Sequence, residues 1–417
     1  MADIHRTIDA VWRIEAARLI ASLARMLRDV SLAEELAQDA LVAALENWPK
    51  AGVPDNPGAW LMATAKHRAV DRLRREKLIV RKHEQIGHDP DVLEAAHTAD
   101  ITEMLDDDIG DDLLRLVFTA CHPVLAIEAR VALTLRMLGG LTTGEIARAF
   151  LVPEATVAQR IVRAKRALSE ANVPFELPRG EERAERLPAV LGVIYLIFNE
   201  GYAATAGEDW MRPQLCEDAL RLGRVLAGLA PDESEVHGLV ALMEIQASRL
   251  HARTGADGEP VLLLEQNRAR WDQLLIRRGL AALARVERLG GVPGPYALQA
   301  AIAACHARAR RAEDTDWARI VMLYDVLARV APSPVVDLNR AVAIAMRSGP
   351  AAGLEEVDRL LDEPALKDYH LLPSVRGDLL GKLDRRDEAR AEFERAAGLA
   401  RNARERALLL QRAAALA

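Results

Sequence analysis

Apolar residues recur three or four positions apart along most of the chain, which is the spacing of an α-helix that buries one face. Residues 10–46 follow this pattern in two stretches. Ser31, with Glu34 three residues later, is predicted to cap the second stretch. The run Asn47-Trp48-Pro49 is predicted to end it, and after a loop rich in proline and glycine the helical pattern resumes near Pro57.

Two short helices are predicted after the break at Gly139-Gly140. Thr142 and Glu145 have the spacing of a capping box and would open the first helix, and a tight turn leads into the second. The pair is therefore a candidate helix-turn-helix. The inner stripe of its second helix is apolar and consists of Val157, Ile161, Ala164 and Leu168. Its outer face is polar and basic and carries Thr156, Gln159, Arg160, Arg163, Lys165 and Arg166.

The part from about residue 185 to residue 417 consists of helix-length segments separated by glycine and proline. Its end looks repetitive, and Ala389, Phe393 and Ala396 have the small-aromatic-small spacing of the second helix of a tetratricopeptide repeat. A generic helical hairpin explains this spacing nearly as well. Because only 4% of the residues are aromatic and no strand pattern stands out, the fold class predicted for the whole chain is all-α.

Charge is distributed unevenly along the chain. The formal net charge of −7 gives no overall attraction for nucleic acid, so that any such function must come from a local patch. Residues 66–82 form a strongly basic stretch, and residues 89–112 are acidic and contain no Lys or Arg. This order predicts a domain edge followed by a solvated linker, although two exposed charged faces would give the same pattern.

Several classes of protein are disfavoured by what the sequence lacks. No apolar stretch approaches the length of a membrane span, and the N-terminus has no apolar segment of a signal peptide. Cys121, Cys216 and Cys305 are far apart and have no zinc-binding spacing, so we expect a reduced, cytoplasmic protein without a metal. No nucleotide-binding or hydrolase motif occurs, and we expect neither a cofactor nor catalytic residues. Residues 199–202 are expected to form a buried turn, with a small ligand pocket as the alternative.

The outer face of the second helix of the helix-turn-helix has the chemistry of a DNA-reading surface. Gln159 can pair with adenine, and Arg160 can pair with guanine through two hydrogen bonds. Arg163, Lys165 and Arg166 are suited to phosphate contacts. The alternative interpretation is an ordinary solvated helix face.

The first 170 residues resemble a bacterial sigma factor of the extracytoplasmic-function (ECF) group. LAEELAQDALVAALENW resembles the region that grips core RNA polymerase, NPGAWLMATAKHRAVDRLRRE the region that melts and reads the −10 promoter element, and LTTGEIARAFLVPEATVAQRIVRAKRAL the domain that reads the −35 element. FNEGY, GPYALQAAIAACHA and PSPVVDLNRAVA are similar to the long, tetratricopeptide-like extension of one sigma subgroup.

The resemblance implies roles for particular residues. The polymerase-facing residues would be Glu35, Gln38 and Asp39. The residues at the −10 element would be Trp60, His67, Arg68, Asp71, Arg72, Arg74 and Arg75. The family often has Asn in place of His67. A structural role for this histidine is therefore at least as well supported as a DNA contact. The residues at the −35 element would be Thr156, Gln159, Arg160 and Arg163, to which the helix pattern adds Lys165.

We therefore expect a polymerase- and −10-binding domain over residues 1–82, an acidic linker over 83–111, a −35-binding domain over 112–174 and a helical regulatory domain over 185–417. The function predicted is promoter recognition as a dissociable subunit of RNA polymerase, with core RNA polymerase and promoter DNA as partners. The extension would act by contact with the DNA-binding domains or by docking a partner protein, and either inhibition or a requirement for activity is compatible with the sequence.

Two other functions compete with this prediction. A one-component helix-turn-helix regulator would sense a ligand or partner through its C-terminal domain and would bind duplex DNA without polymerase. A pure interaction scaffold would use the helix-turn-helix for packing alone and would show no salt-dependent affinity for DNA. The basic stretch that follows Trp60 disfavours both, because neither function requires strand separation.

Overall fold

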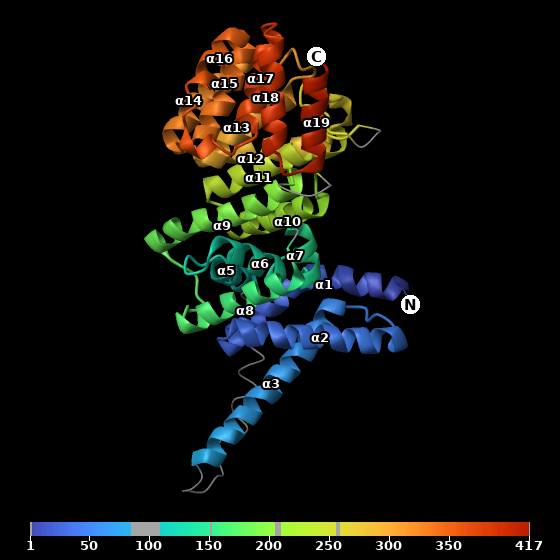
Figure 1. Ribbon diagram of the computed structural model, residues 1–417. Coiled ribbons are helices and arrows are strands. Elements are labelled where there is room, and N and C mark those ends of the chain that lie inside the picture. The colour runs from blue at the N-terminus through green and yellow to red at the C-terminus, as the bar shows by residue number, and fades with distance from the viewer. Residues whose placement is uncertain (1, 85–108, 151, 205–209, 256–258, 417) are drawn as a thin grey trace. The chain divides into compact units, whose positions relative to one another are not determined.

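The computed structural model describes residues 2–84, 109–150, 152–204, 210–255 and 259–416. Regular secondary structure in these ranges is helical, apart from one isolated β-bridge between Thr254 and Pro260, so the predicted all-α fold is confirmed (Figure 1). The chain divides into two compact units, Met1–Val193 and Ile194–Ala417. None of the helices in the described ranges has both the length and the hydropathy needed to cross a membrane.

The first unit begins with three long helices. They are α1 (Ala2–Leu27), α2 (Val30–Ala51) and α3 (Pro57–Glu84), and α1 packs against both of the others. Four shorter helices follow: α5 (Ile109–Ala120), α6 (Ile127–Met137), α7 (Thr143–Phe150) and α8 (Glu154–Glu170). Because α1 also packs against α5 and α6, the helices on both sides of the acidic segment form one unit. Most of the predicted linker, residues 85–108, lies outside the described residues.

Two predictions about α2 are wrong. The helix is capped by Asp29, whose Oδ1 accepts hydrogen bonds from the backbone N–H groups of Ser31 (2.7 Å) and Leu32 (3.0 Å), so Ser31 is not the cap. The helix also continues past Pro49 to Ala51. A proline so close to the end of a helix disrupts little of it, and the buried Trp48 fixes this turn by packing edge to face on Trp60 of α3 (5.4 Å between ring centroids).

The helix-turn-helix forms as the sequence predicts. Thr142 Oγ1 accepts from the N–H of Glu145 (3.1 Å), and the Glu145 carboxylate accepts from the N–H of Thr142 (2.8 Å), which completes the capping box. Ile146 and Ala147 of α7 are buried, and Phe150 is half-buried. The predicted inner stripe of α8 is buried in full and consists of Val157, Ile161, Ala164 and Leu168.

The second unit consists of successive helices, each packed against its neighbours in the chain. α9 (Gly180–Tyr202) spans the division between the units, and its last residues belong to this one. The others are α10 (Pro213–Leu229), α11 (Ser234–Ala247), α12 (Gln273–Leu289), α13 (Pro295–Arg308), α14 (Trp317–Val330), α15 (Pro334–Ser348), α16 (Pro350–Asp358), α17 (Leu371–Lys382), α18 (Arg386–Leu399) and α19 (Ala403–Ala414), with 3-10 turns η1 (Leu250–Ala252), η2 (Arg268–Arg270) and η3 (Pro364–Leu366).

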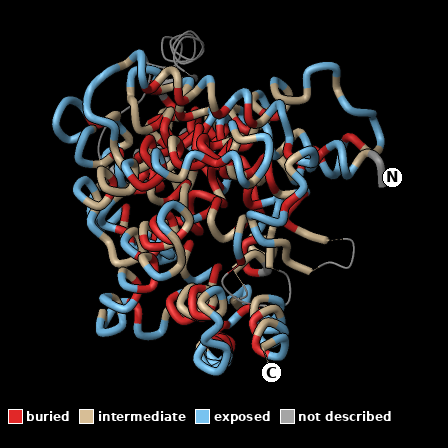
Figure 2. Tube along the Cα trace, turned by 90° about the horizontal axis from the view of Figure 1, so that it is seen from above, coloured by how far each residue is buried: buried red, intermediate tan, exposed pale blue. Residues whose placement is uncertain are grey.

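Small residues allow these helices to approach closely. A Cβ added to Gly238 of α11 would lie 2.7 Å from the backbone of Ala297 in α13. Phe393 of α18 is buried between Ala389 and Ala396 and fills the space beside Gly377 of α17. The predicted small-aromatic-small spacing therefore lies on a buried helix-helix contact. Figure 2 shows how buried and exposed stretches alternate along the helices.

The turn predicted at residues 199–202 is wrong, because these residues form the last turn of α9. Gly201 is needed for close packing there, since an added Cβ would lie 2.6 Å from the backbone nitrogen of Cys216 in α10. Glu200 forms an ion pair with Arg212, just before α10.

Candidate nucleic-acid interface

The outer face of α8 presents part of the predicted DNA-reading set. Gln159 and Arg163 are exposed, and Thr156 and Arg160 are half-buried. Arg166 is also exposed, and its Nε donates to Glu170 Oε1 one turn further along the same helix (2.6 Å). Gln159 and Arg163 therefore face outward, and their side chains have the chemistry for base or phosphate contact.

Lys165 occupies a different environment. It is half-buried, and its ammonium group contacts the carboxylate of Glu34 in α2. In this arrangement the side chain is used to join α8 to the N-terminal helices. A contact between Lys165 and DNA would require this ion pair to break.

Glu34 is a buried carboxylate to which three side chains converge. It is 2% exposed, and its Oε1 accepts from Arg136 Nε of α6 (2.8 Å) and from the side-chain amide of Gln38. A buried carboxylate is costly unless it is paired and hydrogen-bonded, and Arg136 and Lys165 supply the two positive charges. The sequence prediction gave Glu34 only a capping role, although an acidic residue between Ala33 and Ala37 within an apolar helical stripe could have marked it.

Two further ion pairs join α1 to helices that follow the acidic segment. Arg13 of α1 contacts Glu145 at the start of α7 (2.8 Å), and Arg25 of α1 contacts the buried Asp112 of α5 (3.0 Å). Burial acts to raise the pKa of Glu145, but hydrogen bonds from Thr142 and the neighbouring Arg13 hold this pKa below its ordinary value. The carboxylate is therefore charged at neutral pH and attracts Arg13.

The helix expected at the −10 element is α3, and its predicted residues fall into two groups. His67, Asp71, Arg72 and Arg74 are exposed along one stretch of the helix. Trp60 is half-buried against Trp48, and its carbonyl accepts from the hydroxyl of Thr64 (2.8 Å). Arg75 belongs to α3, but its side chain lies outside the described set.

The residues expected to face polymerase lie on α2. Glu35 is exposed, whereas Gln38 is turned toward Glu34. Asp39 is half-exposed and forms an ion pair with Arg68 of α3 (3.2 Å). An ion pair therefore links Asp39, which is predicted to contact polymerase, to Arg68, which is predicted to contact DNA.

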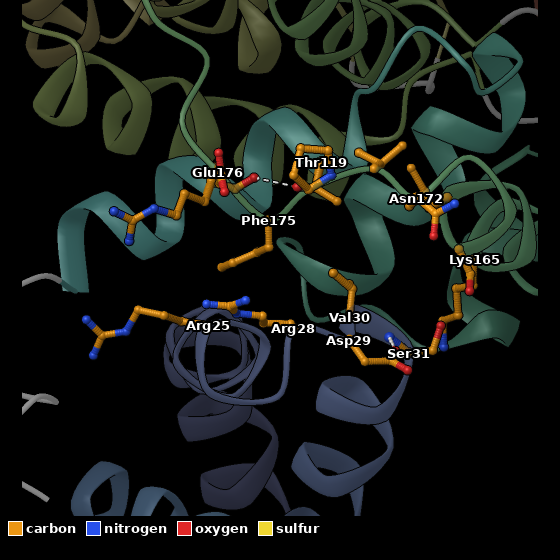
Figure 3. A pocket seen from close by; sticks show the side chains of 15 residues that line it. Arg25, Arg28, Asp29, Val30, Ser31, Thr119, Lys165, Asn172, Phe175 and Glu176 are labelled. Atoms are coloured by element: carbon orange, nitrogen blue, oxygen red, sulfur yellow. Dashed lines mark hydrogen bonds between the residues drawn. The ribbon is translucent and has the colours of Figure 1, made fainter. Parts of the chain in front are cut away.

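A pocket of about 570 Å³ lies where the turn between α1 and α2 meets α5 and the end of α8 (Figure 3). Its basic lining residues are Arg25, Arg28, Arg115 and Lys165. Three of these already form ion pairs with Asp112 or Glu34. Arg25 joins α1 to α5 and Lys165 joins α8 to α2, whereas the pair of Arg115 with Asp112 lies within α5.

The cysteine and histidine at the end of α5 are set apart from this interface. Burial raises the pKa of Cys121 to about 11, so the thiol is protonated at neutral pH, and it lies 3.4 Å from the hydroxyl of Thr134. His122 Nδ1 accepts from the N–H of Val124 (3.2 Å). The ranges that the structure covers contain no group of three or more side chains suited to a metal ion.

Comparison with known proteins identifies these helices. Residues 13–79 match the family model of sigma-70 region 2, and residues 115–168 match that of sigma-70 region 4. Residues 186–287 match a family of unknown function, DUF6596. The first unit therefore contains the two DNA-binding regions of a sigma-70-type transcription initiation factor.

Relatives specify the family further. The ECF RNA polymerase sigma factor SigK of Mycobacterium sp. (strain KMS) is 31% identical over 167 residues, which are 38% of this chain and 80% of the relative. SigK of Mycobacterium ulcerans is 31% identical over 157 residues, 36% of this chain and 78% of the relative. The chain belongs to the ECF family of RNA polymerase sigma factors, as its motifs predict. An uncharacterized protein of Rhizobium meliloti, R00370, is 44% identical over 397 residues, covering 93% of this chain and 90% of the relative.

Proposed function

We propose that this sigma factor binds core RNA polymerase through α2, reads and melts the −10 element with α3, and reads the −35 element with α8. The observation that carries the proposal is the presence of both sigma-70 regions, in order, with Gln159 and Arg163 exposed on the second helix of the capped helix-turn-helix. The chain would supply DNA contacts and polymerase docking, while the polymerase supplies the catalysis.

Each helix has a part in this scheme. In the major groove, Gln159 would pair with a base edge, and Arg163 would neutralise a phosphate. On α3, His67, Arg72 and Arg74 would lie along the DNA, and their release of counterions would make the affinity sensitive to salt. Trp60 and Asp71 would contribute to the −10 contact, as the family resemblance implies.

The ion pairs within the first unit add a step to this function. Lys165 is engaged by Glu34, and Arg68 is engaged by Asp39. A DNA contact by Lys165 would therefore require the N-terminal helices and the helix-turn-helix to separate, whereas a DNA contact by Arg68 would require only its ion pair between α2 and α3 to break. Polymerase binding to α2 would favour this release, because polymerase and the Lys165 side chain would compete for the same helix.

The second unit would regulate this activity, either by contact with the DNA-binding regions or by docking another protein. The relative from Rhizobium meliloti supports a role for the second unit in the same function as the sigma regions, because its similarity extends over 93% of this chain rather than over the sigma regions alone. Helices packed one after another, as in repeat proteins, commonly provide extended binding surfaces.

The test is promoter binding by the full chain assembled with bacterial core polymerase. Gln159→Ala should weaken binding at the −35 element by roughly tenfold, for a lost base contact of about 1–3 kcal/mol. Arg163→Ala should also weaken binding and should make it less sensitive to salt, because it removes a phosphate contact. Arg288→Ala, at an exposed position of α12, is the matched control and should bind like the parent protein. Equal binding by all variants would contradict the role of α8, and binding to duplex DNA without polymerase would favour a one-component regulator.

A further inference from the structure

Two buried arginines and one half-buried arginine meet among aromatic rings in the second unit. Arg249 and Arg253 are each only 8% exposed. The guanidinium of Arg253 lies 3.6 Å from the ring centroid of Tyr202 and 4.4 Å from that of Trp210. It also donates to the backbone carbonyl of Tyr202. The end of α9 and the turn after α11 are therefore held together at a buried cation.

Arg249 and Arg268 lie on either side of this contact. Arg249 is 5.7 Å from the centroids of both Tyr202 and Trp271, and Arg268 is 5.0 Å from that of Trp271. Arg268 is anchored by hydrogen bonds from Nη1 to the carbonyls of His306 (2.7 Å) and Ala309 (2.8 Å). Arg249, Arg253 and Arg268, together with Trp210, Trp271 and His306, are called the arginine cluster below.

The charges of the arginine cluster are only partly balanced by the residues around it, since Glu405 lies near Arg253 and Glu313 and Asp314 lie near Arg268 without direct ion pairs. Within the described ranges, no carboxylate forms an ion pair with Arg249, Arg253 or Arg268. Aromatic faces attract a guanidinium, but a buried charge without a counterion carries a large desolvation cost that such contacts offset only in part. Arg249 also repels both Arg253 and the half-buried Arg268, which increases this cost.

Polar groups in the cluster also lack hydrogen-bond partners. Among the described residues, none bonds to the buried Nε atoms of Arg249 and Arg268, the indole nitrogens of Trp210 and Trp271, or Nδ1 of His306. The indole and guanidinium groups are donors only. Buried polar groups are nearly always paired in folded proteins, so a concentration of unpaired donors indicates a missing acceptor.

His306 does not add a fourth positive charge. It is 8% exposed, and burial, followed by the nearby Arg249 and Arg268, lowers its pKa to about 4. The ring is therefore neutral at pH 7. A neutral imidazole can present either an N–H or a lone pair to a bound group, depending on its tautomer.

We propose that the arginine cluster of the second unit is a binding site for the phosphate group of a small molecule. A phosphate can carry two negative charges and offers several acceptor oxygens, which matches a site with more than one arginine and additional N–H donors. A carboxylate would neutralise only one of the charges. The group could be free phosphate or part of a phosphorylated metabolite. The site goes beyond the proposed promoter function and gives residues 186–287, which match a family of unknown function, a ligand of stated chemistry.

The experiment titrates the full chain, dialysed into chloride, with inorganic phosphate at constant ionic strength and follows binding by calorimetry. One phosphate should bind per chain. Arg249→Gln should weaken the binding at least tenfold, and Arg288→Gln, at an exposed arginine of α12, should leave it unchanged. Acetate is the carboxylate comparison, and adenosine monophosphate distinguishes a phosphate ester from the free ion.

The outcomes separate the possibilities. Tighter binding of either phosphate compound than of acetate, lost in Arg249→Gln, supports the site, and the tighter of the two compounds identifies the source. Absence of binding of both phosphate compounds by the parent chain, equal binding by Arg249→Gln, or a preference for acetate overturns it. The parent titration decides the matter if the variant fails to fold. None of these results depends on transcription, so failure here leaves the proposed function intact.

Discussion

Glu34 shows how one side chain can determine the arrangement of a whole unit. It lies on a helix that is otherwise buried through alanine and leucine, and it draws Arg136 and Lys165 from two other helices. The periodicity of α2 predicted which face is buried. It could not predict that Arg136 and Lys165 pair with Glu34, because both lie more than a hundred residues away in sequence and meet it only after α6 and α8 are packed.

Glu34→Gln should destabilise the protein by about 3 kcal/mol, because it removes one side of a buried ion pair and leaves two cations without their partner. Denaturant unfolding measures this loss. Glu35→Gln is the matched control at the neighbouring, exposed position, and it should change the free energy of unfolding by less than about 0.5 kcal/mol. Equal stability of the two variants would show that the Glu34 contacts do not hold the unit together.

His306 provides a test at acidic pH. Its pKa is about 4 in the folded protein, below the ordinary value of 6.5, so the unfolded chain binds the proton first as the pH falls. The stability that this histidine contributes is present above pH 6.5 and is lost as the pH falls toward 4, by up to about 3 kcal/mol. Unfolding measured between pH 7 and pH 4.5 should therefore show a weaker pH dependence in His306→Asn, and parallel curves for the two proteins would contradict this.

At the scale of elements, the sequence predicted well what depends on neighbours in the chain. The capping box of Thr142 and Glu145 and the inner stripe of α8 require only local spacing, and both are confirmed. The end of α2 was mispredicted because tertiary packing of Trp48 outweighs the breaking tendency of Pro49. The exposed residues of α3 and α8 remain predictions as DNA contacts, since their role depends on a partner.

The cap of α2 can be tested by two substitutions in one turn. Asp29→Ala should cost about 1 kcal/mol, because Asp29 accepts from two N–H groups at the start of the helix. Ser31→Ala should cost less than about 0.5 kcal/mol, because Ser31 lies inside the helix and does not cap it. Thermal unfolding of the two variants should rank them in this order, and a larger loss for Ser31→Ala would restore the capping box predicted from the sequence.

At the scale of the whole molecule, the structure indicates where the chain can be divided. The first unit extends to Val193, beyond the helix-turn-helix, because Arg186 of α9 donates to the carbonyl of Phe118 (2.9 Å) and lies over its ring. The sequence alone placed the start of the regulatory part near residue 185. Charge and helical spacing predicted the order of the parts, but the contact of Arg186 with α5 could not be predicted from them.

Removal of residues 194–417 should change promoter-dependent transcription, because the second unit is proposed to regulate the first. The cut falls within α9, and the truncated chain keeps both Arg186 and its partner Phe118. Transcript yield with core polymerase, compared with that of the full chain, measures the effect. Identical yields and identical partner binding would exclude control by the second unit.

Run-off transcription by the full chain with bacterial core polymerase, over a library of genomic promoters, tests the central claim most directly. We expect promoter-specific transcripts that depend on both the chain and the core enzyme, and that are reduced by Arg163→Ala. The contradicting result is the absence of transcripts and of core binding, together with direct binding of the chain to duplex DNA.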